Sequence, residues 1–213
     1  MTTSTQTLRP GRKPRFDRDA IVARIADLFW ARGYDGVSLS DVMAETGLSK
    51  SSLYNSFGDK DDLFRISLSH YHTQVVEAGA DWLALDDGAD PLGKLDQLLS
   101  GPADDVFGAD PDSRGCFLCN TSADGFSHTP EVNDLVGQGF DALTHGMTTL
   151  LRRAAPGAPS DALTDLAATL VTAYAGMRVR SRHAKTRPEL DSVRRTLITM
   201  TRGQLALISG RQT

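Results

Sequence analysis

The hydroxyl-rich stretch from Thr46 to Lys60 is the part of the sequence best suited to bind a polar partner. Taken as a short helix, it has only three large apolar side chains, which are Leu53, Tyr54 and Phe57. Short or polar side chains surround them: Ser49, Lys50, Ser51, Ser52, Asn55 and Ser56. Hydroxyl, amide and ammonium groups hydrogen-bond to base edges and phosphates, so this composition indicates contact with a nucleic acid.

Two short helices joined by a tight turn at residues 47–49 are expected to position this stretch. Ser38 or Ser40 can cap the first helix, and Ser49 can cap the second, which covers residues 50–57. The spacing is typical of a helix-turn-helix, whose second helix enters the major groove of DNA. The alternative is an αα-corner inside a larger helical protein, because such spacing alone has many false positives.

Individual residues then have expected roles. Lys50 can reach a phosphate or a guanine, and the Tyr54 hydroxyl can donate to a phosphate while its ring packs below. Lys60, in the first turn of the next helix, can clamp the DNA backbone. Backbone N–H groups at the start of the first helix offer another phosphate site. The complete set expected to contact DNA is Arg12, Lys13, Arg15, Ser38, Ser40, Ser49, Lys50, Ser51, Ser52, Tyr54, Asn55 and Lys60.

Charge is unevenly distributed along the chain. The formal net charge is −4 over 213 residues, which alone argues against a nucleic-acid partner. Residues 1–18, however, hold five basic residues and one acidic residue, and residues 1–65 have a net charge of +1. Residues 66–213 have a net charge of −5. The asymmetry suggests that only one end approaches an anion.

The rest of the chain predicts an all-α fold with about nine helices. A flexible basic arm over residues 1–16 precedes a helix-turn-helix unit at 17–64 and a helical body at 65–213. The first helix of the chain, which precedes the two helices of the helix-turn-helix, begins at Asp17 or Asp19 and ends at Gly33. A fourth helix, capped by Asp59 with Asp62 at the third helical position, is expected to reach about Leu85. Further helices are expected at 92–107, 116–127, 130–154, 160–184 and 188–209.

Several functional classes lack support in the sequence. No apolar run is long enough to span a membrane, and the N-terminus has no apolar core of a secretory signal, so a cytoplasmic protein is expected. The five histidines are scattered, and neither a nucleophile elbow nor a phosphate-binding glycine loop occurs. We therefore expect no enzyme activity, no cofactor and no metal.

Residues 17–64 closely resemble the N-terminal domain of TetR-family transcriptional regulators. Met43 and Thr46 depart from the pattern, since alanines are usual there. The two helices of the helix-turn-helix are therefore expected to lie slightly farther apart. The matching positions are Ile21–Phe29, Gly33-Tyr34, Ser38, Asp41-Val42, Gly47-Leu48-Ser49-Lys50, Ser52-Leu53-Tyr54, Phe57 and Lys60–Phe64.

The resemblance implies a homodimer that binds palindromic double-stranded operator DNA and responds to a small-molecule effector. It places the dimer interface on the last two long helices, at about 160–184 and 188–209. The leading hypothesis is a repressor. The alternatives are an activator or global DNA-binding protein of the same fold, an interaction protein that has lost DNA binding, and a helical enzyme.

The resemblance also implies a ligand cavity enclosed by the fourth to the eighth helix of the chain. Each candidate residue could equally belong to the plain hydrophobic core. The residues expected to line the cavity are Trp82, Cys116, Phe117, Asn120, Phe140, His145, Met147 and Tyr174.

The Gly115-Cys116-x-x-x-Asn120 stretch resembles a segment that opens the sixth helix in one TetR-type subgroup. Some members of that subgroup respond to electrophiles or oxidants through this cysteine, and others bind small organic effectors. Cys116 is expected in the first turn of a helix beside Arg114, where the pKa of its thiol would be lowered. The open alternatives are a buried hydrophobic role, a zinc site with Cys119 and His128, and a redox-active Cys-x-x-Cys.

Overall fold

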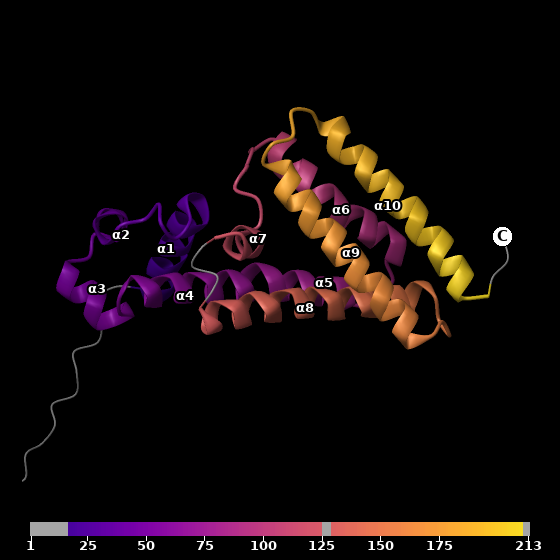
Figure 1. The fold of residues 1–213 in the computed structure, drawn as a ribbon, viewed down its shortest axis with the longest axis horizontal. Helices are drawn as coiled ribbons and strands as arrows, with labels where there is room; N and C mark the ends of the chain where they lie inside the picture. Colours follow the sequence, from indigo (N-terminus) through magenta and orange to yellow (C-terminus); the bar gives the residue numbers. More distant parts are fainter. Residues whose placement is uncertain (1–16, 125–128, 211–213) are drawn as a thin grey trace, which may run out of the picture.

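The structure, a computed structural model, describes residues 17–124 and 129–210. Every regular element in these ranges is helical, which confirms the all-α prediction (Figure 1). The segments are α1 (Arg18–Arg32), α2 (Leu39–Thr46), α3 (Lys50–Phe57), α4 (Lys60–Tyr71), η1 (His72–Glu77), α5 (Ala78–Ala84), α6 (Pro91–Phe107), α7 (Phe117–Ser122), α8 (Pro130–Ala154), α9 (Ser160–Ser181) and α10 (Arg187–Ile208). Because α4, η1 and α5 follow one another without a break, the described residues form nine helices.

Side-chain caps set where the N-terminal helices begin. Asp17 caps α1, Ser49 caps α3, and Asp59 forms a reciprocal capping box with Asp62 at the start of α4. Ser38, and not Ser40, caps α2, because the Ser38 side chain accepts the backbone N–H of Asp41. Of the two caps that the sequence allowed, Ser38 is therefore correct and Ser40 is not, since Ser40 lies within the first turn of α2.

One long helical rod connects the two ends of the molecule. In Figure 1, α1, α2 and α3 gather around the start of α4, and the continuing helix runs beside α8 toward α6, α9 and α10. The middle of the rod, η1, is a π-helix, which the sequence pattern did not predict. Such wide turns occur mostly as short interruptions of α-helices and frequently at functional sites.

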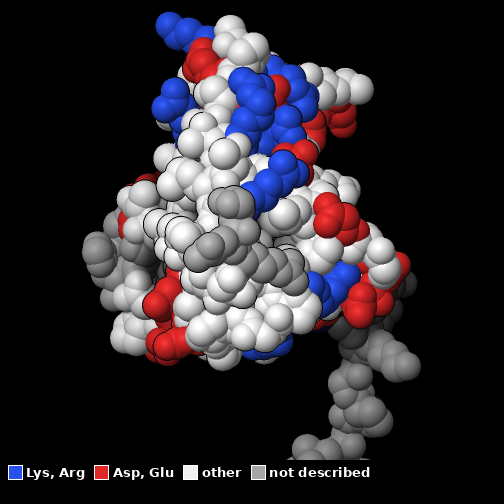
Figure 2. Space-filling model, turned by 90° about the vertical axis from the view of Figure 1, so that its right-hand side faces the viewer, with Lys and Arg blue, Asp and Glu red and all other residues white. Residues whose placement is uncertain are grey.

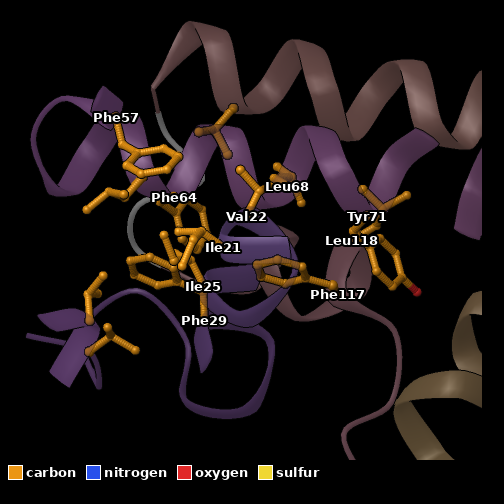
Figure 3. Close-up of a cluster of buried hydrophobic side chains, with 14 of the residues drawn as sticks. Ile21, Val22, Ile25, Phe29, Phe57, Phe64, Leu68, Tyr71, Phe117 and Leu118 are labelled. Atoms are coloured by element: carbon orange, nitrogen blue, oxygen red, sulfur yellow. The ribbon is translucent and has the colours of Figure 1, made fainter. Parts of the chain in front are cut away.

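Aromatic packing joins the N-terminal unit to the body. Phe64 lies with its ring centre 5.3 Å from that of Phe29 and 5.7 Å from that of Phe117, in both cases edge to face. All three rings are buried in one cluster that also contains Leu68 and Tyr71 (Figure 3). The orientation of the N-terminal unit therefore depends on α7 as well as on α4.

Two cations hold the far end of the rod. Lys94 is only 4% exposed, and its Nζ donates to the carbonyl oxygens of Trp82 at 3.0 Å and Leu85 at 2.9 Å. Arg153 from α8 also donates to the Leu85 carbonyl, at 2.6 Å. Positive charge is favourable at the carbonyl end of a helix, so these side chains fix the end of α5 against α6 and α8.

Candidate nucleic-acid interface and internal pocket

The outer face of α3 presents polar and cationic side chains. Lys50, Ser51, Tyr54 and Asn55 are exposed, whereas the other side of the helix buries Leu53. Tyr54 is 41% exposed, and the Lys50 Nζ lies 5.8 Å from its ring centre. The face therefore presents an ammonium, a phenol, a hydroxyl and an amide together, the groups that bind phosphates and base edges.

Two of the serines predicted to contact DNA, Ser49 and Ser52, hydrogen-bond to each other at the start of α3. The Ser49 hydroxyl accepts the backbone N–H of Ser52 at 3.2 Å and donates to the Ser52 hydroxyl at 2.9 Å. The Ser51 hydroxyl lies 3.1 Å from that of Ser49. Ser49 is thus the N-cap of α3, and Ser51 remains on the exposed side.

The turn before α3 and the end of α3 are held by contacts that sequence reasoning missed. The Thr46 hydroxyl donates to the Val42 carbonyl at 2.7 Å and accepts the Leu48 backbone N–H at 3.3 Å, which closes the turn. Arg18 donates to the Ser56 carbonyl at 2.6 Å, and its guanidinium carbon lies 4.6 Å from the Phe57 ring centre. Capping of the last carbonyls by a basic side chain needs a tertiary contact, which the local sequence does not reveal.

Lys60 and Tyr34 form a second polar area at the start of α4. The Lys60 Nζ lies 4.1 Å from the Tyr34 ring centre, and the Tyr34 hydroxyl donates to the Asp61 carboxylate. Burial, followed by this hydrogen bond, raises the pKa of Tyr34. The expected contacts Arg12, Lys13 and Arg15 lie outside the described residues.

A pocket of about 470 Å³ lies beside η1, lined by residues of the body and by Trp30 of α1. We call it the Cys116 pocket. Val75 and Val76 of η1 border it, together with aromatic side chains and two carboxylates. Its principal lining residues are Trp30, Tyr71, Val75, Val76, Trp82, Asp105, Asp112, Cys116, Tyr174 and Arg178. This volume is within the range of small-molecule sites in proteins.

Cys116 lies at the N-cap position of α7, not in its first turn as expected. The Tyr71 hydroxyl donates to its Sγ at 3.5 Å. Hydrogen bonding by the Cys119 thiol lowers the pKa of Cys116 to about 6, helped by the Cys119 backbone N–H and Tyr71 and opposed by burial. Both cysteines are free thiols, and the pKa of Cys119 is raised by the same pairing and by its burial.

The cation near Cys116 is Arg178, not Arg114. Arg114 pairs instead with Asp112 at 2.9 Å and with Asp27 at 2.8 Å, and stacks over Trp30. Arg178 favours the Cys116 thiolate through its charge, as the last of the contributions to the lowered pKa. The expected role of Arg114 is therefore wrong.

The expected cavity residues separate into four groups. Trp82, Cys116 and Tyr174 line the Cys116 pocket together. Phe117 and Asn120 border a different pocket, between α1 and α7. Phe140 packs between the two hydrophobic clusters, and Met147 is fully buried in one of them. His145 is exposed on α8, so its expected place in the cavity is wrong.

The described residues contain no group of three or more His, Cys, Asp or Glu side chains that could hold a metal ion. His128, the third ligand considered for zinc, lies outside the described ranges. Among the helices of the described chain, none combines the length and the apolar character needed to cross a membrane.

A helix-turn-helix with an exposed polar face, joined by one long helical rod to a helical body, is the architecture of a DNA-binding transcriptional regulator. Residues 21–65 match the family described as bacterial regulatory proteins, tetR family. The chain is 31% identical to the HTH-type transcriptional repressor BdcR of Escherichia coli K12 over 143 residues, which cover 67% of this chain and 69% of BdcR. The chain belongs to the TetR family.

Other relatives cover different shares of their own length. The chain is 42% identical to the repressor ComR of Escherichia coli K12 over 72 residues, which are 33% of this chain and 34% of ComR. It therefore spans only about a third of ComR, and it spans 61% of the regulator YezE of Bacillus subtilis. A structure of a cysteine mutant of the TetR-family regulator CifR, complexed with a 26-base-pair operator DNA, is similar with a TM-score of 0.71 and 30% identity, covering 88% of this chain and 98% of CifR.

Proposed function

We propose that the protein is a homodimeric transcriptional repressor that binds a palindromic operator and is released by a small molecule or by modification of Cys116. The observation that carries the proposal is the exposed face of α3, with Lys50, Ser51, Tyr54 and Asn55 on a helix-turn-helix. The repressor names of BdcR and ComR and the operator complex of CifR support it.

The surface of α9 and α10 is the proposed dimer interface. A groove of about 380 Å³ runs between these helices, lined by Leu166, Leu170, Leu197 and Met200 among others. Met200 is 64% exposed, and Leu207, two turns later on the same face of α10, is 76% exposed, so both add apolar surface that a second copy could cover. Figure 2, which views the molecule from the side of α10, shows a patch of uncharged side chains in the middle of this face, with basic side chains gathered toward the top. A two-fold dimer through this face would present two α3 helices to successive major grooves.

Release is proposed to act through η1. The Cys116 pocket touches η1 directly, and η1 continues without a break into α4, which begins with Lys60. A ligand or adduct that fits only one position of η1 would shift the population of helix tilts and thereby the spacing of the two α3 helices. The Gly115-Cys116-x-x-x-Asn120 subgroup, whose members sense electrophiles or organic effectors, is part of this proposal.

Binding of DNA from upstream of the protein's own gene tests the proposal. Wild type should shift this DNA at concentrations at which unrelated DNA of equal length stays free. Tyr54→Ala and Lys60→Ala should each weaken binding and lower the slope of log affinity against log salt by ~1, because each removes a phosphate contact. Lys185→Ala, an exposed lysine before α10, is the matched control and should bind like wild type. Equal binding by folded Tyr54→Ala, Lys60→Ala and wild type would contradict the assignment of α3 and α4 as the DNA-binding elements.

A further inference from the structure

A second pocket, of about 420 Å³, lies where the N-terminal unit meets the body. We call it the Arg182 pocket. One wall is the end of α1 with Gly33, and the opposite wall is α7 together with Arg182 after the end of α9. The two pockets have different linings and share only Trp30. The polar residues of the Arg182 pocket are Trp30, Arg32, Asn120, Thr121, Asp124 and Arg182.

Two polar atoms in the lining are buried without a hydrogen-bond partner among the described residues. They are the indole Nε1 of Trp30 and the hydroxyl of Thr121, a residue that is only 1% exposed. Thr121 borders the Arg182 pocket and not the Cys116 pocket. A buried donor without an acceptor is costly in a folded protein, and such groups in native structures usually have a ligand, water or functional role.

Arg182 is held in place by two residues of the α7 segment. Its Nη1 donates to the Asn120 Oδ1 at 3.0 Å, while the Asn120 Nδ2 donates to the Arg114 carbonyl at 2.8 Å. A Cβ on Gly115 would lie 2.9 Å from the Arg182 Cδ, so glycine makes room for the arginine stem. No carboxylate lies within 4.0 Å of the Arg182 guanidinium in the described part of the chain, and its charge is not neutralised by an ion pair.

The charges and donors around the pocket favour an anion. Arg32 and Arg182 supply two positive charges and Asp124 one negative charge, and Arg32 also pairs with Asp41 at 3.4 Å. The Asp124 Oδ2 accepts the Tyr34 backbone N–H at 3.1 Å, so this carboxylate joins the two walls. An indole N–H can only donate, a hydroxyl can donate, and a guanidinium matches the oxygens of a carboxylate or phosphate.

We infer that the Arg182 pocket is a second small-molecule site, which binds a small carboxylate or phosphate anion between the N-terminal unit and the body. The anion's oxygens take hydrogen bonds from Arg182, Thr121 and the Trp30 indole. This site is distinct from the Cys116 pocket, although Trp30 borders both. The experiment that tests it uses no DNA, so its outcome is independent of the proposed repressor function.

The Trp30 indole N–H is the direct probe of binding. The chain has two tryptophans, and Trp82→Phe assigns the Trp30 signal in a proton–nitrogen NMR spectrum. Titration with inorganic phosphate or acetate should shift the Trp30 indole signal downfield and saturate, because the N–H gains an acceptor. Sodium chloride at matched ionic strength should not produce this shift.

Four variants locate the anion. Arg182→Gln should weaken binding about tenfold, as expected for loss of a charge-assisted hydrogen bond, whereas Arg180→Gln, an exposed position in the last turn of α9, should bind like wild type. Thr121→Val keeps the side-chain shape and should weaken binding several-fold without lowering the melting temperature of the free protein. Tyr174→Phe alters only the Cys116 pocket and should leave binding unchanged.

Three results would overturn the inference. The first is a Trp30 signal that neither anion moves beyond the salt control. The second is equal affinity in Arg182→Gln and Arg180→Gln, which would leave Arg182 a purely structural partner of Asn120. The third is binding that is lost in Tyr174→Phe and kept in Arg182→Gln, which would place the anion in the Cys116 pocket.

Discussion

Gly146 on α8 lies directly against the backbone of α5, and we expect it to tolerate no side chain. A Cβ at this position would lie 2.5 Å from the Ala80 carbonyl oxygen and 2.9 Å from the Ala80 Cα. Both are backbone atoms, so relief requires a shift of α5. Gly137 on the same helix is the matched control, because a Cβ added there would meet no atom within 4 Å.

The two substitutions separate helix propensity from packing. Replacing glycine by alanine within a helix stabilises by ~1 kcal/mol, so Gly137→Ala should raise the free energy of unfolding by about that amount. Gly146→Ala has the same propensity gain, but forcing extra volume into a packed contact costs ~1–3 kcal/mol, toward the upper end where backbone must move. We therefore expect Gly146→Ala to lose ~2 kcal/mol and the variants to differ by ~3 kcal/mol.

Urea unfolding followed by far-ultraviolet circular dichroism measures this difference. All proteins must be compared at one concentration, because association stabilises by mass action. The midpoint should rise for Gly137→Ala and fall for Gly146→Ala, with an unchanged slope. Operator affinity should fall only for Gly146→Ala, because α5 is continuous through η1 with α4, which carries Lys60 at its start. If Gly146→Ala is as stable as Gly137→Ala, α5 and α8 lie farther apart than the structure shows, and the reasoning is refuted.

Three further predictions follow from buried charge, thiol chemistry and the exposed apolar face. Lys94→Met should lower the free energy of unfolding by ~1–3 kcal/mol, because the Trp82 carbonyl loses its side-chain donor, the Leu85 carbonyl keeps only Arg153, and Asp87 loses its ion pair, while exposed Lys185→Met should change it by less than ~0.5 kcal/mol in the same urea titration. Alkylation of Cys116, mapped by mass spectrometry, should accelerate as pH rises through about 6, since the thiolate reacts and the pKa is lowered; a rate that rises only near the ordinary thiol pKa of ~8.5 would contradict this. Met200→Glu should give folded monomers by light scattering, and Thr199→Glu on the same helix should stay dimeric. A stable Met200→Glu dimer would place the interface elsewhere.

The helix-turn-helix could be predicted closely because its signals are local. Ser49 and Asp59 precede helices as caps, and glycines at positions 47 and 58 end helices with positive φ. These interactions connect residues within one turn, so spacing alone reveals them. The choice of Ser38 over Ser40 was harder, because both are serines before the same apolar residues and only one has the Asp41 partner of a capping box.

The pocket was less predictable, because it depends on which faces of distant helices meet. The buried positions of α8 include Val136, Gly139, Gly146 and Leu150, which recur at helical spacing. His145 falls off this stripe, so the periodicity itself could have excluded it from the cavity. Local patterns held no comparable signal for Arg178, which reaches the Gly115 carbonyl at 2.9 Å from a helix far along the chain.

The Gly115-to-Asn120 stretch shows why a motif cannot be interpreted from its own residues. Cys116 borders one pocket, whereas Asn120, four residues later on α7, borders the other and orients Arg182, which is 62 residues away. Gly115 has a φ of 77° and also lies against the Arg182 stem, so both the backbone shape and the arginine position need glycine. One short stretch thus shapes both pockets, and a substitution at Gly115 would disturb the thiol and the arginine together. Distinguishing the effects of the two pockets therefore requires variants of Cys116 and Arg182, because each of these side chains borders only one pocket.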